Sequence, residues 1–274
     1  MSLTSFLKNK DVREKFSQEF PKSKFNLKQE ILASPITKHY PLMGTAFDYL
    51  MRFYLERINP KAITKRWVAE SSLTSIEIME GIESNLYKKA KQIIAGAKTI
   101  YSDYIKSGEM DDEVIRSAIF LAQLDPIFRA GFVDENIGIV DEGDITDLKS
   151  LLSIINPNTF KAKEICILNP TFGKASALVG GADVDLVIDN MLIDIKTAKN
   201  LELTRSYFNQ IIGYYILFRI GGIDGASPRF SIETLGIYYS RYGILYYIPI
   251  KDVIDEAKLP AFIKWFKERA TSEA

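Results

Sequence analysis

Two aspartates and a lysine interrupt a pair of short apolar runs. Asp185 lies in the first run, and Asp194 and Lys196 lie in the second. The runs are rich in branched side chains and are separated by Asp189-Asn190, a pair that tolerates left-handed backbone and favours a two-residue hairpin turn. Carboxylates suit Mg²⁺ and Mn²⁺, and Mg²⁺ is typically held by one or two of them together with water and substrate phosphates. The stretch therefore predicts a β-hairpin that holds a divalent cation, with Lys196 beside it.

The predicted turn fixes the register of the hairpin, because side chains alternate between the two faces of a strand. Asp185 is then directly opposite Asp194. Asp183 is opposite Lys196 on the same face. The other face is apolar and carries Val184, Leu186, Ile188, Met191, Ile193 and Ile195. Like charges directly opposite one another, with Cβ atoms about 4.5–5.5 Å apart, destabilise a strand pair, and a cation between Asp185 and Asp194 would remove that cost.

A purely structural interpretation competes with the metal site. In that interpretation Asp183 and Lys196 form a solvated cross-strand ion pair. Asp185 and Asp194 then face water and protect a sheet edge against aggregation. The residues after the hairpin favour the metal site over this alternative.

A helix predicted after the hairpin carries a second pattern. Thr204 is placed to cap it and Gly221-Gly222 to end it. Gln210 and Tyr214 share one of its faces at a spacing of four residues. An acid on one strand, Asp-x-Lys on the next and Gln-x-x-x-Tyr on the following helix resemble the PD-(D/E)XK nuclease superfamily, specifically its RecB-type exonuclease branch.

The resemblance implies a role for each matching residue. The catalytic set that it implies is Asp185, Asp194, Lys196, Gln210 and Tyr214. The metal ligands that it implies for Mg²⁺ or Mn²⁺ are Asp185, Asp194, Ile195 through its backbone, and Asp48. Lys196 would position or activate the attacking water. Val184 stands where the proline that names the superfamily would precede Asp185.

The resemblance spans roughly residues 163–248 and extends weakly to 44–56. It implies an α/β fold of the restriction-endonuclease-like type, with a mixed central sheet flanked by helices and an inserted α-helical subdomain. We predict an N-terminal arm and the first core helix in residues 1–59, the helical insertion in 60–156, and the nuclease core with the catalytic hairpin and a C-terminal helix in 157–274.

Asp48 admits two interpretations. Apolar residues at helical spacing predict a helix over residues 44–57, and Asp48, Arg52 and Glu56 follow one another on one of its faces. The branch carries a histidine at about the place of Asp48, so this aspartate would join a second metal. A surface ladder of salt bridges explains the same spacing equally well.

DNA contacts must come from local basic groups, because the chain has 35 Lys and Arg against 35 Asp and Glu. Lys and Arg that neutralise phosphates dominate affinity for DNA. A dense basic cluster in the helical insertion supplies Lys88, Lys89 and Lys91. Lys199 and Arg205 follow the hairpin and are further candidates for nucleic-acid binding.

Composition excludes several other classes of site. With 274 residues, of which 47% are hydrophobic and 26% charged, the chain has the composition of a globular protein with a full core. A single cysteine, Cys166, excludes an internal disulfide framework and any four-cysteine iron–sulfur or zinc site. A single histidine, His39, excludes histidine-based zinc sites. No segment is apolar for long enough to predict a membrane span, and we expect a cytoplasmic protein.

The sequence and the resemblance together predict a metal-dependent nuclease that hydrolyses DNA phosphodiester bonds in an exonuclease-like manner. The alternative is a catalytically silent subunit that binds nucleic acid or supports an assembly and keeps a nuclease-like fold. The retained acids argue against that alternative, since a silent site does not need an acid facing an acid. A hydrolase acting on RNA or nucleotides is a third hypothesis. A homo-oligomer and a nuclease or helicase partner both stay open.

Overall fold

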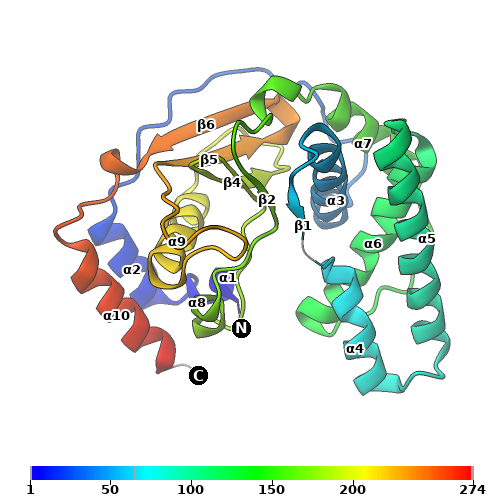
Figure 1. The fold of residues 1–274 in the computed structure, drawn as a ribbon, viewed down its shortest axis with the longest axis horizontal. Coiled ribbons are helices and arrows are strands. Elements are labelled where there is room, and N and C mark those ends of the chain that lie inside the picture. Colours follow the sequence, from blue (N-terminus) through cyan, green and yellow to red (C-terminus); the bar gives the residue numbers. More distant parts are fainter. Residues whose placement is uncertain (1, 65, 273–274) are drawn as a thin grey trace.

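The computed structural model describes residues 2–64 and 66–272. Its centre is a mixed sheet of six strands, whose spatial order β1 to β6 follows the order of the sequence. Helices cover both faces of this sheet (Figure 1), so the described chain is an α/β fold. The strands are β1 (Ile63–Thr64), β2 (Cys166–Leu168), β3 (Leu186–Ile188), β4 (Met191–Lys196), β5 (Thr234–Tyr239) and β6 (Ile244–Pro249).

Ten α-helices lie within the described residues. The N-terminal half contains α1 (Leu3–Phe6), α2 (Lys10–Glu19), α3 (Tyr40–Ile58), α4 (Val68–Glu80), α5 (Asn85–Ser107) and α6 (Asp112–Ala130). The remainder contains α7 (Glu142–Ser153), α8 (Lys174–Leu178), α9 (Arg205–Gly221) and α10 (Leu259–Thr271). Among the helices of 2–64 and 66–272, none is long and apolar enough to cross a membrane.

The predicted hairpin is present with the predicted register between its strands. Leu186 is opposite Ile193, and β3 and β4 run antiparallel. Asp189 has a φ of 50°, the left-handed backbone that a tight turn requires. The strand β4 also pairs in parallel with β5, and β1 pairs in parallel with β2. The hairpin is therefore in the middle of the sheet and not at an edge.

The register ends where β3 begins, so the expected pair of Asp185 and Asp194 is not part of the ladder, and two further expectations fail there. Asp183 makes an isolated bridge with Thr171 and is not opposite Lys196. Val184 packs in the same core as Val187, on the face opposite to the one we expected. The cause is the neighbouring segment: Val184 donates its N–H to the carbonyl of Pro170, 3.1 Å away, and so turns away from β4.

Two hydrophobic cores occupy the two faces of the sheet. On one face Leu186 and Ile193 pack with α3 and with helices α4 to α7. On the other face Val187 and Leu192 pack with α9 and with α1, α2, α8 and α10. Alternate residues of one hairpin thus enter different cores, which is the period of two expected of a strand buried on both sides.

Residues 60–156 are mainly helical, as predicted, but they also contain β1. This strand pairs Ile63 with Ile167 and Thr64 with Leu168, so it belongs to the central sheet. Two helices in the C-terminal part of the chain, α9 and α10, are also close to the predicted positions. The α9 cap is Thr204, whose side chain accepts from the N–H of Tyr207, and α10 has a proline in its first turn. The first long helix, α3, begins at Tyr40 and not at Gly44.

Candidate active site

The acids and the lysine of the hairpin meet where β4 extends past the start of β3. Asp194 and Lys196 are two positions apart on β4, so their side chains leave the same face of the strand. Nζ of Lys196 lies 2.7 Å from Oδ2 of Asp194. The lysine therefore pairs with Asp194, which corrects the expected pairing with Asp183. Only 2% of Asp194 is exposed, so this ion pair is buried.

Asp185 directly precedes β3 and reaches the same place from the other arm of the hairpin. Its Oδ2 accepts the backbone N–H of Ile195 at 2.5 Å. The N–H and carbonyl of a strand residue point toward the same neighbour, so the carbonyl of Ile195 is directed to the edge where Asp185 lies. Val184, the residue that would pair with Ile195 in a continued ladder, bonds to Pro170 instead. Because the ladder ends here, the carbonyl oxygen of Ile195 is left without a partner among the described strands on this side and lies beside two carboxylates.

Helix α9 adds Gln210 and Tyr214 to the group. Lys196 donates to Oε1 of Gln210 at 2.8 Å, and Nε2 of Gln210 donates to the hydroxyl of Tyr214 at 2.9 Å. The two residues share a helix face at a spacing of four, as the sequence predicted. A chain of hydrogen bonds therefore runs from the helix to the ammonium group and fixes the position of Lys196.

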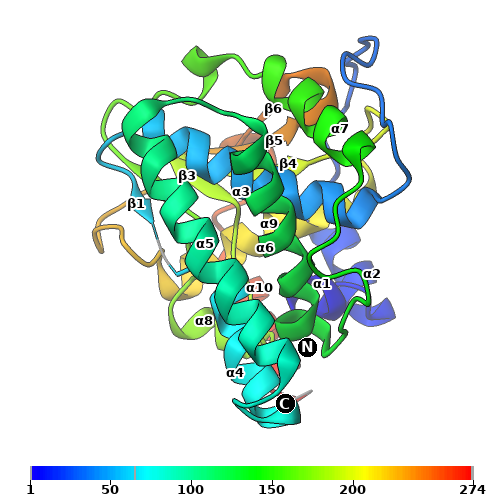
Figure 2. The ribbon, with the colours of Figure 1, turned by 90° about the vertical axis from the view of Figure 1, so that its right-hand side faces the viewer.

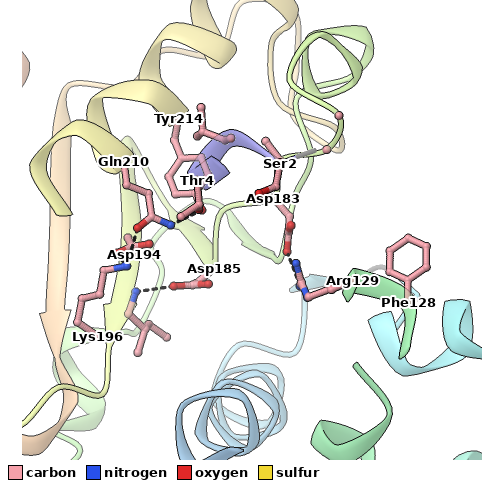
Figure 3. A pocket seen from close by; sticks show the side chains of 15 residues that line it. Ser2, Thr4, Phe128, Arg129, Asp183, Asp185, Asp194, Lys196, Gln210 and Tyr214 are labelled. Atoms are coloured by element: carbon pink, nitrogen blue, oxygen red, sulfur yellow. Dashed lines mark hydrogen bonds and ion pairs between the residues drawn. The ribbon is translucent and has the colours of Figure 1, made fainter. Parts of the chain in front are cut away.

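All five predicted catalytic residues line one cavity of about 570 Å³ (Figure 3). Its walls also include Ser2, Leu3 and Thr4 of the N-terminal segment, Phe128 and Arg129 of α6, and residues 180–183. The cavity is therefore bordered by both layers of helices and by the end of β4. The structure brings together residues that the sequence separates widely.

Asp48 approaches the site from α3. A smaller cavity of about 210 Å³ is lined by Asp48 together with Asp185 and Ile195, which also line the larger one. Oδ2 of Asp48 pairs with Arg52 at 2.6 Å, while Oδ1 is buried and has no hydrogen-bond partner in the described part of the chain. The side chain of Arg52 is only 6% exposed. The alternative of a surface ladder is thus wrong for Arg52, which is buried, while Asp48 is partly buried beside the site.

Burial and mutual repulsion oppose ionisation of these acids. Burial raises the pKa of Asp185 well above its usual value, and the neighbouring charges of Asp194 and Asp48 raise it further. Burial also raises the pKa of Asp194, although Lys196 acts in the opposite direction. For Lys196 burial acts to lower the pKa of the ammonium, but Asp194 and Asp185 hold that pKa above its usual value.

These features fit a divalent cation. Mg²⁺ and Mn²⁺ prefer oxygen ligands. The site offers the unpartnered Oδ1 of Asp48, the mutually repelling carboxylates of Asp185 and Asp194, and the backbone carbonyl of Ile195. Within 2–64 and 66–272 there is no cluster of three or more His, Cys, Asp or Glu arranged around one point. Asp48 is therefore not grouped with the two hairpin acids around one point in the described residues. Asp185, Asp194 and the carbonyl of Ile195 would hold the ion, and Asp48 would face it from the adjoining cavity.

Sequence reasoning missed the contribution of α6. Arg129 lies 3.2 Å from Oδ2 of Asp183, across 54 residues of sequence, and 3.8 Å from Asp125 on its own helix. Asp125 also accepts from the hydroxyl of Tyr49 at 2.7 Å. Burial raises the pKa of Asp125 to about 6. The spacing of four residues between Asp125 and Arg129 could have predicted their ion pair. No local pattern in the sequence indicated the contact of Arg129 with Asp183 of the hairpin segment.

The residues predicted to contact nucleic acid lie in two separate regions of the structure. Lys88, Lys89 and Lys91 are exposed residues of α5, a helix that faces the viewer in Figure 2, and they do not line the described cavity. Lys88 pairs with Glu83 at 2.9 Å, and Lys89 donates to the carbonyl of Ile137. Lys199 is exposed just after β4. Arg205 is the first residue of α9, close to Gln210 in the chain. All five assignments stay predictions.

Comparison of the chain with known proteins adds no support to this geometry. No protein-family model, no curated protein and no solved structure matches the chain.

Proposed function

We propose that this chain is a metal-dependent nuclease that hydrolyses DNA phosphodiester bonds, with a restriction-endonuclease-like core of the PD-(D/E)XK type. The observation that carries the proposal is the single cavity shared by Asp185, Asp194 and Lys196 with Gln210 and Tyr214. Asp185 directly precedes β3, Asp194 and Lys196 lie on β4, and Gln210 and Tyr214 lie on α9. This is the order along the chain that the RecB-type resemblance implies. The mixed sheet covered by helices on both faces is compatible with such a core.

Each group has a distinct task in this proposal. Mg²⁺ or Mn²⁺ supplies Lewis acidity and lowers the pKa of bound water when it occupies the site. Asp185, Asp194 and the Ile195 carbonyl hold it. The ammonium of Lys196, positioned by Asp194 at 2.7 Å and Gln210 at 2.8 Å, stabilises negative charge that develops on the phosphoryl group.

The mouth of the cavity supports a nucleic-acid substrate. Phe128 lines the cavity although 52% of its surface is exposed. Every nucleobase has a π face that stacks on an aromatic ring, and such stacking is worth roughly 1–3 kcal/mol per base. A strand that enters the cavity would place its phosphate toward the acids and a base on Phe128. Because α1 and α6 both form walls, we expect a strand with a free end to enter most readily.

The test of this function is digestion of linear and circular DNA, single- and double-stranded, with Mg²⁺, Mn²⁺ or EDTA. We expect cleavage that requires a metal ion and is faster on linear than on circular substrates. Equal rates on linear and relaxed circular DNA would remove the exonuclease part of the proposal. An absence of cleavage on every substrate with both metals would remove the nuclease itself.

A further inference from the structure

A second cavity of about 230 Å³ borders the active-site cavity along α9. Thr4 and Gln210 line both cavities, so the two spaces adjoin at the glutamine that positions Lys196. None of the predicted catalytic or metal-binding residues except Gln210 lines the second cavity. Its chemistry is therefore separate from that of the carboxylates, although a bound chain could occupy both.

The second cavity is lined by cations without acids. Lys8, Arg13 and Arg205 contribute to its walls, and none of its lining residues is an aspartate or glutamate. The contrast with the rest of the chain is informative, because Lys and Arg equal Asp and Glu in number. Arg129 and Arg241, for example, pair with aspartates. Three cations around one small space raise the local positive potential and favour an anion there.

The guanidinium of Arg205 is held in place. It donates to the carbonyl of Phe20 at 2.9 Å and lies 5.4 Å from the ring centroid of Phe208. Arg205 also opens α9, a helix of 17 residues, whose first N–H groups carry partial positive charge. A fixed cation at a helix N-terminus is prepared to receive an anion without further ordering.

Asn209 adds an independent polar feature. It lines the same cavity, only 2% of it is exposed, and its Oδ1 is buried without a hydrogen-bond partner among the described residues. A buried amide normally satisfies its polar atoms. The amide also carries a donor, Nδ2, the kind of group from which an oxygen of an anion in the cavity would accept a hydrogen bond.

We propose that this second cavity binds a phosphate group of the substrate strand, next to the phosphate that is hydrolysed. The inference rests on the proposed nuclease function and extends it by naming where the strand is held. A neighbouring phosphodiester and a terminal phosphomonoester present the same anionic oxygens to Lys8, Arg13 and Arg205. Binding there would draw the strand along α9 and fix its register at Gln210.

The test uses the full chain and a fluorescent single-stranded oligonucleotide, with EDTA present to prevent hydrolysis, over a series of salt concentrations. The variant is Lys8→Gln/Arg13→Gln, since both side chains are exposed and do not support the core. The matched control is Lys161→Gln/Lys163→Gln, near the turn end of the hairpin, where Lys163 contacts Asp189 through its N–H. Oligonucleotides with a hydroxyl or a phosphate at each end separate the two sources of phosphate.

We expect the first variant to bind at least about tenfold more weakly, because hydrogen bonds to charged groups are lost. The slope of log affinity against log salt should fall by about 0.7 for each phosphate contact removed. The control should bind as the wild type does. A loss on every oligonucleotide assigns the cavity to an internal phosphate, and a loss confined to one phosphorylated end assigns it to that terminus.

Two results would overturn the inference in distinguishable ways. If the wild type cleaves DNA but the Lys8→Gln/Arg13→Gln variant keeps its affinity and salt slope, the phosphate site is wrong and the nuclease assignment survives. If the wild type neither binds nor cleaves DNA, the proposed function fails and the phosphate site fails with it.

Discussion

The ammonium of Lys196 lies 2.7 Å from Asp194 on the same strand and donates to Gln210 on α9 at 2.8 Å. These two contacts of Lys196 connect the sheet to α9 at the point where the charged groups of the cavity lie together. It also means that Lys196 is not a loose surface lysine, because only 15% of its side chain is exposed. Replacing it should therefore affect folding as well as chemistry, because the buried carboxylate of Asp194 would lose its partner.

Lys196→Ala should reduce turnover by about 10²–10³, the usual effect of removing one preorganised electrostatic group. The affinity for Mn²⁺ should stay the same or rise, since a cation beside Asp185 and Asp194 is removed. Steady-state cleavage and Mn²⁺ titration on the same preparation measure both effects. Lys161→Ala, outside the cavity, is the control. Wild-type turnover in the Lys196 variant would end the catalytic role of this lysine.

Asp185→Asn should lose metal-dependent cleavage while its melting temperature, without metal, is unchanged or higher. The reason is that Asp185 is partly buried and repelled by Asp194 and Asp48, while an asparagine oxygen still accepts the N–H of Ile195. Mn²⁺ should raise the melting temperature of the wild type and not that of the variant, because only the wild type binds the ion. Scanning calorimetry with and without Mn²⁺ measures this, and equal stabilisation of both proteins would contradict it.

Asp125 should make the stability of the protein depend on pH. Burial raises its pKa from 3.8 to about 6, so the folded state binds the proton more tightly than the unfolded state. The contribution of Asp125 to the free energy of unfolding is fully present below pH 4. It is lost as the pH rises through about 6, by up to about 3 kcal/mol. Asp125→Asn should therefore be more stable than the wild type at pH 8 and similar at pH 4. Urea unfolding at both pH values checks the sign, and a difference that does not change with pH would contradict it.

Phe128→Ala should weaken binding of single-stranded DNA by roughly 5- to 100-fold, the loss of one stacked base. Phe128→Tyr should restore it, because the aromatic face remains. Phe132→Ala is a matched control, since Phe132 is 59% exposed but does not line the cavity. Fluorescence anisotropy in EDTA measures the three variants. Equal losses for Phe128→Ala and Phe132→Ala would show that general hydrophobicity, and not stacking at the cavity, is responsible.

Local sequence signals were enough to predict the hairpin and α9. Asp189 and Asn190 set the turn, and the register from Leu186–Ile193 to the turn follows from it. Thr204 and the glycines after Ile220 bound α9, which placed Gln210 and Tyr214 on one face. These features depend on residues within a few positions of one another, and for that reason they are readable from the chain.

Features that depend on distant segments were missed or misplaced. The strand β1 has two residues and exists only because it pairs with β2, about a hundred residues later. Asp183 is drawn away from Lys196 by Thr171 and Arg129. The walls contributed by α1 and α6 arise from tertiary packing, which no periodicity in those segments encodes.

The most direct test of the proposed metal-dependent nuclease activity is the release of acid-soluble nucleotides from linear DNA by the wild type and by Asp194→Asn, purified in parallel. The wild type should digest DNA with Mn²⁺ or Mg²⁺ and not with EDTA. Asp194→Asn should be folded and reduced by at least about 10³, because it lacks a metal ligand and the partner that positions Lys196. Digestion by Asp194→Asn at the wild-type rate would contradict the account.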